Sequence, residues 1–156
     1  MFTIRSFFKV DDAFIPVSKY FGEFPDPEFI DGAIEIEFDG ELMLSCKDWD
    51  YIDQLWGYLI NGLFTIAEGK KFNTCLPEQV TELSFQPSND LKQIKFEVMS
   101  SEYHKVIINF GEFVRVMIKE GKAFFKKMSE LLPEDKIHKD EYTKLLVLEQ
   151  KLAHLL

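Results

Sequence analysis

The segment from Asp48 to Glu68 constrains the fold most, because apolar side chains recur along it at three- and four-residue steps. They are Trp49, Ile52, Leu55, Trp56, Leu59, Ile60, Leu63, Phe64 and Ala67. Ser45 or Asp48 can cap the start of a helix here, and Gly69 can end it. The spacing predicts a long amphipathic helix whose apolar stripe is the main packing partner of a sheet.

Strand-like segments flank this helix on both sides. Phe2 to Val10 is rich in Phe, Ile and Thr, and Ala13 to Val17 either extends this strand or pairs with it. Beyond the helix, turn-forming residues separate three strands of a meander. Their ranges are Val80 to Gln86, Leu91 to Met99, and Tyr103 to Asn109. Ser18 to Ile30 contains glycine and prolines, so an ordered but irregular loop is expected there.

Ala33 to Leu44 predicts a β-hairpin, because apolar and acidic residues alternate along its first half. A two-residue Asp39-Gly40 loop is the common solution, but it leaves Leu42 beside a glutamate. A three-residue loop, Phe38 to Gly40, pairs Ile36 with Leu42 and keeps the apolar side chains on one face. Since burial of one face sets the register, we expect the three-residue loop with a bulge.

Two helices should follow the meander. Asn109 and Glu112 fit an N-cap and its partner for a helix that runs to Leu132, where Pro133 stops it. The last helix, roughly Ile137 to Leu155, is amphipathic. The element order predicts a single α+β domain over residues 1–156, with a mostly antiparallel sheet packed against the long amphipathic helix and two C-terminal helices.

The net charge of −9 restricts the partners of the chain. Nucleic-acid binders need a basic surface to displace counterions from phosphates, and anionic lipid repels an acidic protein. Asp11 and Asp12 interrupt the apolar N-terminus, so no signal peptide is predicted, and the apolar stretch Leu55 to Ala67 is too short to span a bilayer. Cys46 and Cys75 do not form a disulfide framework. We expect a cytoplasmic protein with reduced thiols that binds neither nucleic acid nor membrane.

The acidic residues are concentrated in the first part of the chain. Residues 1–68 contain 14 acids and 4 bases, whereas residues 69–156 contain 13 acids and 14 bases. Within residues 23–53, where Lys47 is the only base, the acids are Glu23, Asp26, Glu28, Asp31, Glu35, Glu37, Asp39, Glu41, Asp48, Asp50 and Asp53. We expect them to form one continuous anionic surface that docks onto a basic protein partner. The alternative is a solvated face that keeps the protein soluble.

The chain carries no catalytic motif of a known kind. It lacks a Gly-rich phosphate loop, Cys-x-x-Cys, His-Glu-x-x-His and Gly-x-Ser-x-Gly. His104 is expected in the core or at a sheet edge, and His138 and His154 at the surface. Carboxylates near Cys46 should raise the pKa of its thiol, although a helix N-terminus would lower it. We expect no enzymatic activity, no cofactor and no metal.

An acidic α+β plan without a catalytic motif is combined here with the segment Asp48-Trp49-Asp50-Tyr51-Ile52-Asp53-Gln54-Leu55-Trp56. In this layout the chain resembles small bacterial immunity proteins, and several uncharacterised bacterial families look similar. Immunity proteins neutralise a toxin by tight, often electrostatic binding. The resemblance therefore implies a toxin as the basic partner, and it assigns no individual site residue.

Other functions stay open at this level. A small-molecule binding module would hold its ligand between sheet and helix, against Trp56, Phe64 and Phe96. An oligomerising protein would use the last helix as its contact. An enzyme of another kind would need a deep pocket holding His104 or Cys46 with a second titratable group.

Overall fold

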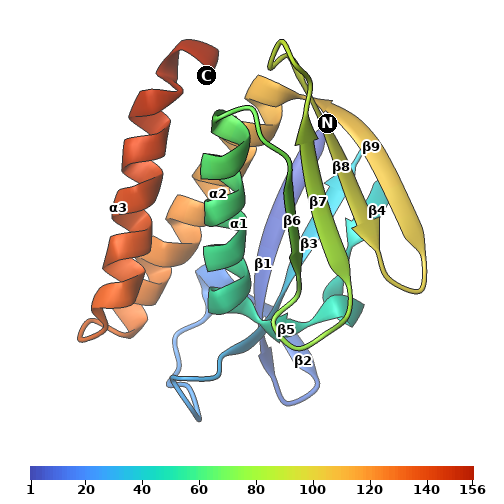
Figure 1. The fold of residues 1–156 in the computed structure, drawn as a ribbon. Helices are drawn as coiled ribbons and strands as arrows, with labels where there is room; N and C mark the ends of the chain where they lie inside the picture. The colour runs from blue at the N-terminus through green and yellow to red at the C-terminus, as the bar shows by residue number, and fades with distance from the viewer.

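The computed structural model describes residues 1–156 and confirms the α+β class. Its strands are β1 (Phe2–Val10), β2 (Ala13–Pro16), β3 (Asp31–Phe38), β4 (Glu41–Leu44), β5 (Asp50–Tyr51), β6 (Phe72–Cys75), β7 (Glu82–Pro87), β8 (Gln93–Met99) and β9 (Tyr103–Asn109). Its helices are α1 (Ile52–Ala67), α2 (Phe110–Leu131) and α3 (Lys136–Lys151), with single 3₁₀ turns at Val17–Lys19, Cys46–Asp48 and Ala153–Leu155. The helices lie together on one side of the strands (Figure 1).

The strands form two antiparallel sheets, where the sequence suggested one. The first has the order β2-β1-β3-β4, with the short β5 also paired to β3, and the second is the meander β6-β7-β8-β9. Strand β6 was not predicted, because its four residues carry no long apolar pattern. It extends the meander, and Phe72 packs on Phe85 of β7 with the ring centroids 5.5 Å apart.

The hairpin turn differs from the expectation. Phe38 pairs with Glu41 across a two-residue loop, so the three-residue loop is wrong. Asp39 and Gly40 both have positive φ, of 48° and 86°, which is the backbone of the tight turn that matches strand twist. The expected bulge is present, but it lies further along: the register shifts so that Ile36 faces Leu44. A bulge lets Met43 and Leu44 both be buried, which a regular strand does not allow.

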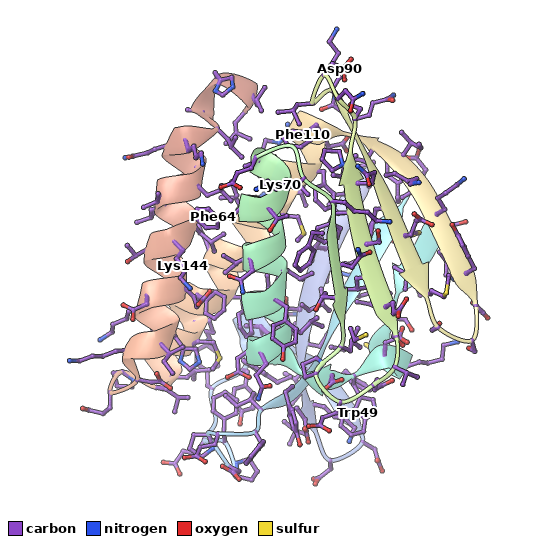
Figure 2. All side chains as sticks on the ribbon, in the orientation of Figure 1. Trp49, Phe64, Lys70, Asp90, Phe110 and Lys144 are labelled. Carbon is purple, nitrogen blue, oxygen red and sulfur yellow. The ribbon has the colours of Figure 1, made fainter.

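Helix α1 begins at Ile52, four residues later than predicted. Ser45 and Asp48 do form a cap, but they cap the 3₁₀ turn Cys46–Asp48 and not α1. Trp49 therefore lies outside the helix and is 39% exposed, at the lower end of the molecule (Figure 2). At its other end α1 stops as predicted, since Gly69 has φ +79° and its N–H donates to the Ile66 carbonyl at 2.9 Å.

Aromatic side chains of α2 join the two sheets and α1 into one core. Phe113 lies 5.2 Å from Phe2 of the first sheet and 5.0 Å from Phe85 of the second, between ring centroids. Further along, Phe124 packs on Phe8 of β1 at 6.2 Å and on Trp56 of α1 at 6.1 Å. Phe110, at the start of α2, is labelled in Figure 2.

Helix α3 packs against α2 and α1 of the same chain. Leu145 and Leu148 are fully buried, and they hold α3 against the α2 side of the core. None of the helices combines the length and apolarity that crossing a bilayer requires.

Phe113→Ala should destabilise the fold by about 3–5 kcal/mol, because it leaves a cavity where both sheets meet α2. Urea unfolding followed by circular dichroism measures the loss. Phe21→Ala is the matched control, since Phe21 is 86% exposed and its removal should cost under about 1 kcal/mol. Equal losses in the two variants would contradict this description of the core.

Candidate functional site

The acidic residues predicted from the sequence extend along the whole of β3 and differ in their surroundings. Asp31 begins β3, Glu35 and Glu37 lie along it, and Asp39 follows its other end. At about 3.4 Å per residue, these ends lie about 25 Å apart. The acids therefore have different surroundings along this length.

Two of these acids, Glu35 and Asp39, are neutralised locally. Glu35 forms an ion pair with Arg5, its cross-strand neighbour on β1, and Asp39 pairs with the N-terminal ammonium. Glu41 lies 3.8 Å from Nδ1 of His104. Glu37 lies half-buried on β3 and has no ion-pair partner. This part of the sheet consequently carries less negative charge than its sequence suggests.

Asp48 and Asp50 act inside the fold. Asp48 Oδ2 accepts a hydrogen bond from the backbone N–H of Ser45 at 3.1 Å. Asp50 is only 4% exposed, and its Oδ2 accepts from the backbone N–H groups of Glu78 and Gln79 at 2.9 and 3.1 Å. Asp50 thus fastens the loop between β6 and β7 to β5, and it does not present its charge to a partner.

The loop before β3, strand β5 and the loop between β6 and β7 meet at the lower end of the molecule in Figure 1, and they carry a smaller group of acids. We call Asp26, Glu28, Phe29, Asp31, Tyr51 and Glu78 the acidic end. Phe29 is 51% exposed, and its ring centroid lies 5.3 Å from that of Tyr51. None of the four carboxylates has an ion-pair partner. Exposed Glu23 lies in the same loop.

The pKa of Tyr51 responds to the negative charge of the acidic end. This pKa is raised above the ordinary value, first by burial and then by the negative charges of Glu78, Asp31, Asp50 and Asp26. Glu78 was not predicted, because it lies far along the chain from the other acids and only the loop held by Asp50 brings it here.

Two lysines lie over aromatic rings that flank the segments of the acidic end in sequence. Lys9 Nζ lies 4.5 Å from the centroid of Trp49, and Lys127 Nζ lies 4.0 Å from that of Phe21. Neither lysine forms an ion pair with a carboxylate of the acidic end.

Beside the acidic end lies a cleft of about 590 Å³ between α1 and α3, which we call the α1–α3 cleft. Its lining includes Glu28, Asp53, Tyr58, Asp135, His138 and Glu141. The prediction that His138 is a surface residue is wrong: it is 2% exposed and stacks on Phe125 at 6.0 Å. Its Nε2 lies 3.5 Å from Asp53 Oδ2, and its Nδ1 lies 3.6 Å from Asp135 Oδ2. The sequence pattern of α3 did not reveal that His138 is buried, because the residues that cover it lie on other elements, such as Phe125 on α2 and Asp53 on α1.

A second cleft of about 550 Å³ lies between β1 and α2. Its lining mixes basic side chains, such as Arg5 and Lys126, with Glu120 and Glu130. Burial raises the pKa of Glu120. The mixture of signs gives this cleft no clear preference for a charged ligand.

The other candidate positions do not line either cleft. Trp56 and Phe96 are fully buried in the packed core, and Phe64 is half-buried against it. His104 is a half-buried sheet residue, as expected, with Nε2 3.2 Å from Glu102 Oε2. Burial, more than the nearby Glu35, raises the pKa of the Cys46 thiol. No group of three or more carboxylate, imidazole or thiol side chains is arranged to hold a metal ion.

No protein-family model, curated protein or solved structure matches this chain. Its possible functions follow from the geometry and charge of these sites.

Asp50→Asn should destabilise the protein by about 2–3 kcal/mol, because the amide cannot accept as strongly from two backbone N–H groups as the carboxylate does. Asp31→Asn removes the same charge nearby, without losing such bonds, and should leave stability nearly unchanged. Thermal unfolding of both variants tests this. A similar change in midpoint for the two would contradict the role given to Asp50.

The double variant Asp31→Asn/Glu78→Gln should lower the pKa of Tyr51, because two of the charges that disfavour the phenolate are removed. An NMR titration of the tyrosine ring carbons measures this pKa. Glu130→Gln is the control, because it removes a charge that does not act on Tyr51 and should leave its pKa unchanged. An unchanged Tyr51 pKa in the double variant would show that these carboxylates do not surround the ring.

Proposed function

We propose that this protein is a non-enzymatic, cytoplasmic binding protein that docks onto a basic protein partner through its acidic end. The resemblance in layout to bacterial immunity proteins adds that the partner is a toxin and that binding inhibits it. One observation carries the proposal: four carboxylates without ion-pair partners lie close to exposed Phe29 and half-buried Tyr51.

Unpaired carboxylates that gather on a surface repel one another and disfavour the compact state slightly. Lysine and arginine side chains of a partner would remove this repulsion and raise the association rate by electrostatic steering. The ring faces of Phe29 and Tyr51 add a favourable contact for a guanidinium group. Aromatic and arginine side chains are the groups that most often dominate the energy of protein interfaces.

The interface proposed here is narrower than the surface expected from the sequence. Asp26, Glu28 and Asp31 belong to it, exposed Glu23 lies in the same loop, and Asp53 lies at its margin in the α1–α3 cleft. Glu35, Glu37, Asp39 and Glu41 lie along or beyond β3, and Asp48 and Asp50 are hydrogen-bonded within the fold.

The triple variant Asp26→Asn/Asp31→Asn/Glu78→Gln tests the interface. The wild-type chain should capture a basic protein from its native lysate at low salt, and the triple variant should bind that purified partner at least about tenfold more weakly. Asp90→Asn/Glu102→Gln/Glu130→Gln is the control, since it removes equal charge from exposed positions outside the acidic end.

Calorimetry at increasing salt then separates electrostatic from apolar binding, and the affinity should fall steeply as the charges are screened. A captured partner that is acidic, a flat salt profile, or equal loss in both triple variants would each refute docking through the acidic end.

A further inference from the structure

We infer that the α1–α3 cleft is a binding site for an alkylguanidinium or alkylammonium group. The cleft holds four carboxylates from three segments of the chain: Glu28 from the loop before β3, Asp53 from α1, and Asp135 and Glu141 from the start of α3. Its volume of about 590 Å³ is ample for a small organic cation.

The polar groups of the cleft contain more acceptors than donors. The Oδ1 atoms of Asp53 and Asp135 accept backbone N–H groups at 3.0 and 2.8 Å, whereas their Oδ2 atoms are turned toward His138. Glu141 Oε1 accepts from Lys144 at 2.9 Å, and its buried Oε2 has no hydrogen-bond partner.

His138 gives the second, independent indication of a ligand. Its side chain is 3% exposed and lines the cleft, and its Nδ1 has no hydrogen-bond partner. Buried polar groups are ordinarily hydrogen-bonded, so the unpartnered His138 Nδ1 and Glu141 Oε2 mark a place where partners are missing, and the carboxylate oxygen can be satisfied only by a donor.

The missing donor is best supplied by an organic cation. The nearby lysines are occupied, since Lys144 bonds to Glu141 and Lys139 Nζ donates to the Pro133 carbonyl at 3.0 Å. The carboxylates are not arranged to hold a metal ion. A guanidinium carries five N–H donors and an ammonium three, and the rings of Tyr58 and Phe125 offer apolar walls for the attached alkyl chain.

This inference does not depend on the protein partner proposed above. A free amine or guanidine could supply the cation, and so could a side chain of a partner docked on the acidic end, because Glu28 belongs to both sites.

The test is an NMR titration with n-butylguanidinium, with neutral n-butylurea as the isosteric control. The chain has three histidines, so the ring signals of His104 and His154 serve as internal references. We expect n-butylguanidinium to shift the His138 signal with a dissociation constant on the order of a millimolar or tighter, and n-butylurea to leave it unchanged.

Asp53→Asn/Asp135→Asn should weaken this binding at least about tenfold, because two of the charges that attract the cation are lost. Asparagine keeps the capping oxygen at Asp135, which favours folding of the variant. Asp140→Asn, on the exposed face of α3, is the matched control and should bind as the wild type does. Circular dichroism checks folding, and if the double variant unfolds, Glu141→Gln replaces it with the same expectation of weaker binding.

Absence of a His138 shift up to the solubility limit, equal binding of n-butylurea, or undiminished binding by the cleft variants would overturn the inference. Titration with N-acetylarginine amide distinguishes the sources: binding supports a partner's arginine, and its failure beside bound n-butylguanidinium supports a free cation. The acidic-end triple variant should still bind n-butylguanidinium, so loss of docking and loss of cation binding are separate results.

Discussion

Aromatic packing along α2 is the interaction on which the rest of the structure depends. Neither antiparallel sheet has a second layer of its own, so each must bury its apolar face against a helix. Phe113 contacts both sheets, and Phe124 contacts the first sheet and α1. Because α2 contacts both sheets, α1 and α3, it sets how these layers lie relative to one another.

The fold uses its acidic residues in different ways. Asp48 and Asp50 accept backbone hydrogen bonds, and Glu35 and Asp39 are paired with positive groups. Four carboxylates without ion-pair partners lie at the acidic end, and the adjoining α1–α3 cleft holds Asp53, Asp135 and Glu141, each with only one oxygen in a hydrogen bond. Both places combine negative charge with aromatic rings, the pairing that recognises cationic groups. The proposed docking at the surface and the proposed cation binding in the cleft therefore rest on the same physical chemistry.

Local periodicity predicted most of the elements. The apolar spacing located α1, and Gly69 marked its end. Richness in Phe, Ile and Thr located β1, and turn-forming residues located the meander. The errors lie where a local signal had two solutions. Ser45 and Asp48 do form a cap, but around a 3₁₀ turn, because Asp50 and Tyr51 pair with β3 before the helix can begin. In the hairpin, a bulge beyond a tight Asp39-Gly40 turn buries Met43 and Leu44, which simple alternation did not anticipate.

The sequence by itself determined the α+β class and the concentration of acids in the first half of the chain. These follow from side-chain order along short segments, where each residue's environment depends on near neighbours. Tertiary structure alone decided which acids stay free, why Glu78 joins Asp26 and Asp31, and how His138 becomes buried between Asp53 and Asp135. The physical reason is that electrostatic surroundings depend on distances in space, which are set only when segments remote in sequence pack together.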